Sequence, residues 1–146
     1  GQVMTRWAKK YDTEAIVVID DRSASSALLK KILLGAAPAG IEVTVESVES
    51  AAAKWKAGEF PTKSLIILFK NTDTALRACK AGIAYPSLQV GGIEGAGDKK
   101  NGYKNVVMSK LEAEQLKEIS DAGVNVFLQP IPEDAEFPLE EALKKF

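Results

Sequence analysis

Two adjacent carboxylates follow an apolar run near the start of the chain. Ala15–Ile19 contains only apolar residues, and Asp20 and Asp21 come directly after it. An unbroken apolar run of this length is typical of a strand buried on both faces of a parallel sheet. Two carboxylates at its end can bind Mg²⁺ or act as an acid and a base. They can also cap the helix that follows, which is the commoner role for such residues.

A second polar stretch follows the apolar run Leu65–Phe69, which we interpret as another strand buried on both faces. Asn71, Thr72 and Asp73 then provide caps for a helix that ends near Gly82. Ligands of open α/β sheets bind outside the carboxyl ends of the strands. We therefore expect Asn71 to line the same crevice as Asp20 and Asp21.

A glycine-rich loop, Gly91–Gly97, follows a predicted strand at Ser87–Val90. It lacks the Gly-Lys-Ser/Thr ending of a phosphate-binding loop and does not open a helix after the first strand. A nucleotide- or flavin-binding domain therefore has the right architecture here but no matching motif. Gly91 and Gly92, at the end of a strand, join the candidate site. In the next segment Asn101-Gly102 is the strongest signal for a turn.

Some residue types are missing or rare. The chain has no histidine, so the commonest general base and transition-metal ligand is not available from these residues. Its one cysteine, Cys79, lies in a predicted helix and is interpreted as a buried structural thiol rather than a reactive one. We expect neither a metal site nor a cofactor.

The totals describe an ordinary globular protein. The chain has 146 residues, 46% of them hydrophobic and 27% charged, with a net charge of -1. This balance gives no electrostatic reason to expect nucleic acid or an anionic membrane as a partner. No apolar run approaches the roughly 20 residues that span a bilayer.

Strands alternate with helices along the whole chain, which predicts an α/β fold: a single domain over 1–146, doubly wound, with a mainly parallel open sheet and helices on both faces. Ile41–Val45 alternates in polarity and predicts a half-exposed edge strand. Further strands are predicted at Val106–Met108 and Val124–Leu128. The predicted helices are Val3–Tyr11, Ser25–Leu34 (with Leu28, Leu29, Ile32 and Leu33 on its inner face), Ser47–Lys56, Asp73–Ala81, Ser109–Ala122 and Leu139–Lys145.

The chain begins with a helix at Gly1 and without an initiator Met. Doubly wound units usually begin with a strand, so we expect a strand ahead of Gly1.

The chain contains, in this order, the short motifs Gly1-Gln2-Val3, Ile16–Asp21, Leu34–Gly40, Leu68–Asn71, Leu88–Gly92 and Gln129–Pro132. Their succession resembles the IIB component of the mannose–fructose–sorbose class of bacterial sugar phosphotransferase systems (PTS). Gly1-Gln2-Val3 looks like the end of that family's signature, which closes with His-Gly-Gln-Val. Ile16–Asp21 is similar to its second strand and acidic lip. The likeness continues through Leu34–Gly40, Leu68–Asn71, Leu88–Gly92 and Gln129–Pro132.

The resemblance implies a phosphoryl relay. A IIA protein phosphorylated on histidine passes the group to a histidine of IIB, which passes it to a sugar crossing the membrane through IIC and IID. The resemblance places the acceptor immediately before Gly1, so the chain as given cannot carry out the covalent step. It also implies a cytoplasmic protein, peripheral at the inner face of the membrane, and it allows a homodimer.

On this basis the N–H groups of Gly1 and Gln2, at the start of a helix, can approach the phosphate. Asp20 or Asp21 can orient the histidine by accepting from its other ring nitrogen. The candidate site then comprises Gly1, Gln2, Asp20, Asp21, Asn71, Gly91 and Gly92.

Two explanations account for the missing histidine. The parent protein is a IIB component whose first residues are not in this chain, or it is a catalytically empty regulatory or interaction module on the same fold. The intact Gly1-Gln2-Val3 motif favours the first explanation.

Overall fold

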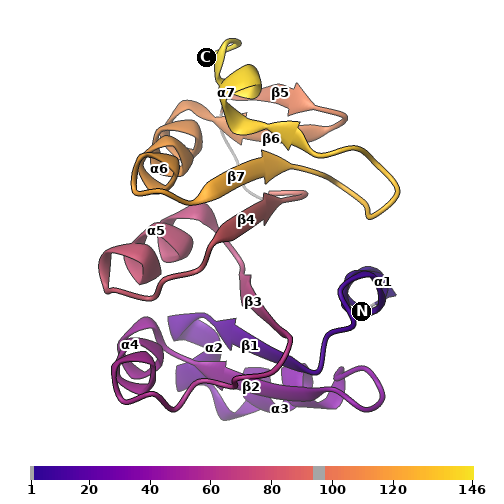
Figure 1. The fold of residues 1–146 in the computed structure, drawn as a ribbon, viewed down its shortest axis with the longest axis vertical. Coiled ribbons are helices and arrows are strands. Elements are labelled where there is room, and N and C mark those ends of the chain that lie inside the picture. Colours follow the sequence, from indigo (N-terminus) through magenta and orange to yellow (C-terminus); the bar gives the residue numbers. More distant parts are fainter. Residues whose placement is uncertain (1, 94–97) are drawn as a thin grey trace. The chain divides into compact units, whose positions relative to one another are not determined.

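The computed structural model describes the backbone of residues 2–93 and 98–146, and side chains from Met4 onward within those ranges. These residues form two compact units (Figure 1). Unit 1 consists of the described residues of Gly1–Lys70 together with Lys80–Ile83. Unit 2 consists of those of Asn71–Cys79 and Ala84–Phe146. The described residues of unit 1 contain one sheet and those of unit 2 contain two, and each unit is described by itself.

The sheet of unit 1 is parallel. Its central strand β1 (Ala15–Ile19) pairs with β2 (Glu42–Glu46) on one side and with β3 (Leu65–Phe69) on the other. Every residue of β1 is at most 3% exposed, so the prediction of a strand buried on both faces is confirmed. The edge position of β2 is confirmed as well.

The prediction for β3 is wrong in its degree of burial. All five of its residues are half-buried rather than buried. Within unit 1 this strand is hydrogen-bonded to β1, at the end of the sheet order β2-β1-β3. An end strand lacks the second neighbour that covers a central one, and apolar composition alone does not distinguish the two positions.

Four helices belong to unit 1: α1 (Gln2–Lys10), α2 (Asp21–Ser25), α3 (Ala27–Gly35) and α4 (Val48–Lys56). Ile16 and Val18 of β1 form the apolar core of one face with Val45 of β2. Residues that pack against this core come from α1, α2 and α3 as well as from the strands: Met4, Ala24, Leu33, Ile41, Val43, Ile66 and Leu68.

The predicted helix Ser25–Leu34 corresponds to α3, and a further short helix that was not predicted, α2, precedes it and is separated from it at Ser26. Its extended backbone (φ -113°, ψ 115°) ends α2, and its side chain caps α3 by accepting from the Leu29 N–H. The predicted inner face is also partly wrong, because Leu28 is 67% and Ile32 is 56% exposed. Leu29 and Leu33 are the half-buried residues of that set.

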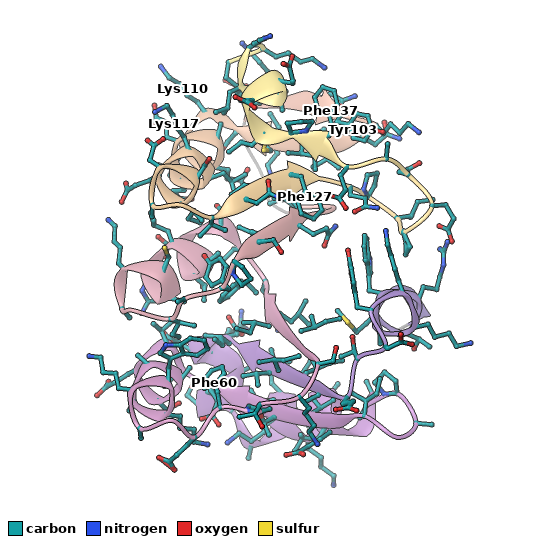
Figure 2. All side chains as sticks on the ribbon, viewed as in Figure 1. Phe60, Tyr103, Lys110, Lys117, Phe127 and Phe137 are labelled. Carbon is teal, nitrogen blue, oxygen red and sulfur yellow. The ribbon has the colours of Figure 1, made fainter. Side chains whose placement is uncertain are left out.

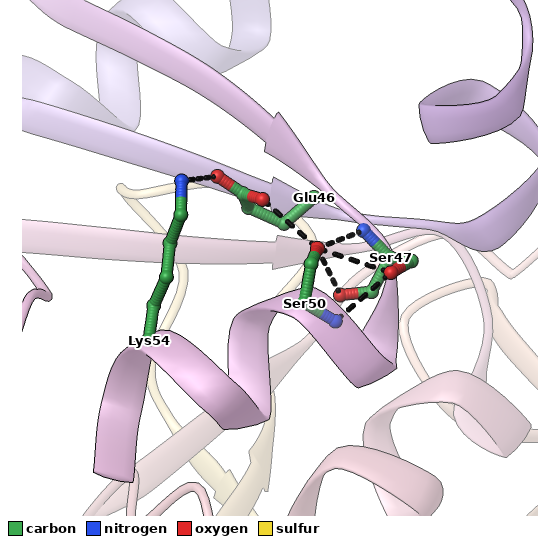
Figure 3. A network of polar contacts seen from close by, with 4 residues as sticks. All are labelled: Glu46, Ser47, Ser50 and Lys54. Atoms are coloured by element: carbon green, nitrogen blue, oxygen red, sulfur yellow. Dashed lines mark hydrogen bonds and ion pairs between the residues drawn. The ribbon is translucent and has the colours of Figure 1, made fainter. Parts of the chain in front are cut away.

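A polar network fixes the start of α4 (Figure 3). Ser47 caps the helix by accepting from the Ser50 N–H at 3.0 Å, and the Ser50 hydroxyl accepts from the Ser47 N–H at 3.0 Å. Ser50 also donates to Glu46 at 2.9 Å, and Glu46 forms an ion pair with Lys54 at 2.5 Å. This capping box joins the end of β2 directly to the first turns of α4.

In unit 2, β4 (Ser87–Val90) pairs in parallel with β7 (Asn125–Leu128), and β8 (Phe137–Pro138) adds to β7 antiparallel. The strands β5 (Lys99–Tyr103) and β6 (Val106–Ser109) form a hairpin. The helices are α5 (Thr72–Lys80, whose last residue is assigned to unit 1), α6 (Lys110–Asp121) and α7 (Leu139–Leu143).

Two aromatic side chains of unit 2, Tyr103 of β5 and Phe137 of β8, stack face to face with 4.6 Å between their ring centroids (Figure 2).

The turn of the β5–β6 hairpin is not at Asn101-Gly102, as the sequence predicted, but at Lys104-Asn105. These two residues adopt positive φ angles of 40° and 69°, as a two-residue hairpin turn requires. Gly102 lies inside β5, where a Cβ would stand 2.8 Å from Leu128 Cδ2 and 3.2 Å from Met108 Cε. The glycine is needed there for close packing and not for a turn.

The α/β class with a parallel sheet and helices is confirmed. The prediction of a single domain over 1–146 stays a prediction. None of the described helices is long and apolar enough to cross a membrane.

Candidate functional site

Asp20 lies at the carboxyl end of β1 and caps α2. Its Oδ2 accepts from the Ser23 N–H at 3.1 Å and from the Ser23 hydroxyl at 2.5 Å. The side chain of Ser23 is fully buried, and the residue Asp20 is only 8% exposed. The capping role that the sequence favoured for Asp20 is therefore confirmed.

Lys70, which sequence analysis did not single out, belongs to the same cluster. It directly follows β3, and its Nζ donates to Ser23 Oγ at 3.0 Å and lies 3.6 Å from Asp20 Oδ2. The parallel pairing of β1 with β3 brings these two strand ends together, although Ser23 and Lys70 are 47 residues apart. The signal that could have found Lys70 is its position one residue beyond an apolar strand.

The surroundings of Asp20 act on its pKa in opposite directions. Burial raises it, but hydrogen bonds from Ser23 and the charge of Lys70 lower it by more, so the pKa lies below its usual 3.8. Asp20 is therefore ionised at neutral pH, in contact with a hydroxyl and an ammonium group.

This pKa predicts how stability depends on pH. A carboxyl group with a lowered pKa in the folded state contributes stability above its unfolded pKa, and loses it as the pH falls through the lower folded value. The free energy of unfolding of the wild type should thus exceed that of Asp20→Asn at pH 7, and the difference should shrink below about pH 4. Urea unfolding of both proteins between pH 3 and 7 measures this difference in the free energy of unfolding. Asp121→Asn is the control, with a side chain 65% exposed and a small expected difference. A difference for Asp20→Asn that is constant over this range contradicts the prediction.

Asp21 has a different partner. Its Oδ1 accepts a hydrogen bond of 2.9 Å from the backbone N–H of Val48, which is the first residue of α4. The carboxylate thereby satisfies one of the N–H groups that the first turn of a helix leaves without an intrahelical partner. Asp20 and Asp21 are adjacent in sequence, but they serve two different helices.

In unit 2, Asn71 also caps a helix. Its Oδ1 accepts from the Thr74 N–H at 2.8 Å, in the first turn of α5. The Thr72 hydroxyl donates to Gln115 Oε1 of α6 at 2.6 Å. The polar stretch after β3 thus starts α5, as predicted, and ties it to α6.

Gly91 and Gly92 follow β4, beside a buried amide. Gln129 follows β7, and its backbone N–H donates to the Val90 carbonyl at 2.9 Å. Its side chain is 1% exposed and donates to the carbonyls of Pro132 and Asp134 at 3.3 and 2.8 Å. The Gln89 amide in turn donates to the Gln129 carbonyl, and a Cβ on Gly91 would lie 3.2 Å from Gln89 Nε2.

The structure thus divides the seven predicted residues. Asp20 and Asp21 lie together in unit 1, while Asn71, Gly91 and Gly92 lie in unit 2, each at the end of a strand. A crevice shared by both groups stays a prediction. Gly1 lies outside the described residues, as does the side chain of Gln2.

Within residues 2–93 and 98–146, no cluster of three or more histidine, cysteine, aspartate or glutamate side chains is arranged to hold a metal ion. Cys79 is a free thiol that is half-buried, whereas a buried structural thiol was predicted.

Comparison with known proteins gives one consistent result. A family model described as "PTS system sorbose subfamily IIB component" matches residues 1–146. The fructose-specific EIIB component of the PTS of Bacillus subtilis is 26% identical over 135 residues, covering 92% of this chain and 83% of that protein. The mannose-specific EIIAB component of Escherichia coli is 23% identical over 145 residues, covering 99% of this chain but 45% of that protein. The crystal structure of manxB from Thermoanaerobacter tengcongensis is 34% identical with a TM-score of 0.87, covering 100% of this chain and 89% of that one.

Proposed function

This chain belongs to the sorbose subfamily of PTS IIB components, and from that membership we propose that it is the phosphoryl carrier between a IIA protein and a sugar. The observation that carries the proposal is the family match over residues 1–146. In the first step the N–P bond to a IIA histidine breaks and an N–P bond to a IIB histidine forms. In the second step the N–P bond to the IIB histidine breaks and a P–O bond to a sugar hydroxyl oxygen forms, while the hydroxyl loses its proton and the released histidine takes one up.

The acceptor histidine is not one of the 146 residues. We propose that it lies immediately ahead of Gly1, on a segment that also supplies a further strand. The proposal of a further strand is supported by β3, which is half-buried and is hydrogen-bonded to β1 on one side in unit 1. In this proposal the phosphate is bound by the N–H group of Gln2, the first residue of α1, and by that of Gly1, the residue before it in the sequence.

Phosphoryl transfer needs positioning and charge neutralisation more than covalent participation by the protein. Asp20 and Asp21 at the carboxyl end of β1 have the chemistry to orient an imidazole. We also propose Asn71, Gly91 and Gly92 as residues that line the phosphate crevice. No step requires a metal or a cofactor.

The proposed partners follow from the same family. The name of the Escherichia coli relative combines the IIA and IIB components in one protein, which supports a IIA partner here. We propose IIC and IID as the membrane partners, and hence a cytoplasmic protein that docks on the inner face of the membrane. In this proposal the transmembrane partners contact the sugar for most of its path, so the residues of this chain do not identify which sugar is transported.

The test uses the complete gene product, including the codons ahead of Gly1. Incubated with phosphorylated IIA, it should take up acid-labile, base-stable phosphate. The 146-residue chain by itself should stay unlabelled, because it contains no histidine. No label on the complete protein overturns the proposal. Equal labelling of both proteins shows that the acceptor is not an upstream histidine.

The absence of histidine supports a second candidate, a catalytically empty regulatory or interaction module on the same fold. The sequence ahead of Gly1 separates the two candidates. A Met start followed by a segment ending in histidine supports the carrier, and a segment without histidine supports the empty module.

A further inference from the structure

Lys70 places a positive charge at the carboxyl end of β3, in the cluster that contains Asp20. Its Nζ is 3.0 Å from the hydroxyl of Ser23 and 3.6 Å from Asp20 Oδ2. The shorter contact is a hydrogen bond, whereas the longer one is beyond normal hydrogen-bond length. The ammonium group is therefore anchored through Ser23 and attracted by Asp20 without being fully engaged by the carboxylate.

The two ends of this cluster differ in exposure. Ser23 is buried completely and the Asp20 side chain is 11% exposed, whereas the Lys70 side chain is 46% exposed. An ammonium group has three donors, and Ser23 accepts one of them. Because the Lys70 side chain is about half exposed, an anion from solution can approach its ammonium group.

We propose that Lys70 is the cation that binds the phosphoryl group on this protein, with Ser23 and Asp20 holding its ammonium group in place. The inference rests on the proposed function and adds a residue to it. During transfer the N–P bond to IIA breaks, the N–P bond to the acceptor forms, and Lys70 keeps its proton throughout. Its charge compensates the negative charge spread over the phosphoryl oxygens.

Lys63 is a matched control in the same unit. It lies just ahead of the amino end of β3, whereas Lys70 follows the carboxyl end. Its side chain is 44% exposed, and its Nζ pairs with a carboxylate, that of Glu42, at 3.4 Å. Lys63→Met therefore removes the same charge, at similar exposure, from the other end of the same strand.

The experiment measures the rate of phosphoryl transfer from saturating phosphorylated IIA to the complete gene product. Lys70→Met should lower this rate about 10- to 100-fold. Lys70→Arg should recover part of it because it keeps the charge, while Lys63→Met should stay within about twofold. Phosphorus NMR of the phosphorylated proteins gives a second readout. Loss of Lys70 should raise the pH at which the phosphoryl group titrates, because a nearby cation favours its more negative form.

A purely structural role for Lys70 predicts something else. Lys70→Met leaves the carboxylate of Asp20 without its counter-charge, so it can weaken the fold around β1. The pair Asp20→Asn and Asp20→Asn/Lys70→Met avoids this, because both proteins lack that carboxylate. If Lys70 binds phosphate, the added Lys70→Met should still slow transfer by about 10-fold or more in this background. If it only neutralises Asp20, the two proteins should transfer equally, which overturns the inference.

Different results would overturn the proposed function and the role of Lys70. A wild-type protein that takes up no label overturns the proposed function and this inference with it. A labelled wild type with Lys70→Met as fast as Lys63→Met overturns the inference alone.

Discussion

Gly102→Val is expected to destabilise unit 2 by about 3 kcal/mol, near the upper end for overpacking of a core. Gly102 lies in β5, and a Cβ there would stand 2.8 Å from Leu128 Cδ2 and 3.2 Å from Met108 Cε. Leu128 and Met108 are both fully buried, so their side chains have little room to move. Valine adds two further methyl groups to a position that lacks space for one. Chemical denaturation followed by circular dichroism measures the loss.

Gly92→Val provides the comparison within the same unit. Gly92 does not have a positive φ angle, and a Cβ there meets no atom within 4 Å. The same substitution should therefore change the free energy of unfolding by less than about 1 kcal/mol. Similar losses at both positions would show that the cost is a general effect of replacing glycine and that close packing at Gly102 is not its cause.

Ile19→Ala is expected to cost about 3 to 4 kcal/mol in unit 1. Ile19 is the last residue of the central strand β1, fully buried and paired in register with Glu46 and Phe69. Truncation removes apolar contacts and leaves a cavity on the face of the sheet where the side chain packs, and the close-packed surroundings can collapse into it only in part. Urea denaturation of the variant and the wild type measures the difference.

Ile32→Ala makes the same chemical change on α3. Ile32 is 56% exposed, so its truncation should alter stability by no more than about 0.5 kcal/mol. This control also tests the correction to the predicted inner face of that helix. A loss at Ile32 comparable with that at Ile19 would mean that α3 packs with its other face inward.

The sequence predicted strands and caps well because both depend on local chemistry. Ala15–Ile19 is an unbroken apolar run, and it forms the buried central strand. Asp20 and Asn71 each precede a helix and each accept from an N–H three residues later. Such patterns require no knowledge of the rest of the fold.

The errors arise where distant residues decide the outcome. Gly102 carries a strong turn signal, yet its close neighbours Leu128 and Met108 place it inside a strand. On α3, the neighbours Ile32 and Leu33 are both strongly apolar, and packing of Leu33 against the core residues of β1 and β2 determines which one is covered. Hydrophobic character alone does not select between adjacent positions on a helix.

The cluster of Ser23 and Lys70 was missed for the same reason. Serine and lysine are common surface residues, and the position of Lys70 directly after an apolar strand does not by itself indicate a contact with Ser23. They become a site only because β1 and β3 pair in parallel and end at the same level.

The bond between Asp21 and the Val48 N–H has a consequence for how the loops move. It fastens the segment after β1 to the segment after β2, so neither can shift without breaking a hydrogen bond to a charged group. Ions bind tightly to loops that are already ordered, because little conformational entropy is then lost on binding. The hydrogen bond between Asp21 and Val48 thus preorganises this end of unit 1, where Asp20, Ser23 and Lys70 lie in contact.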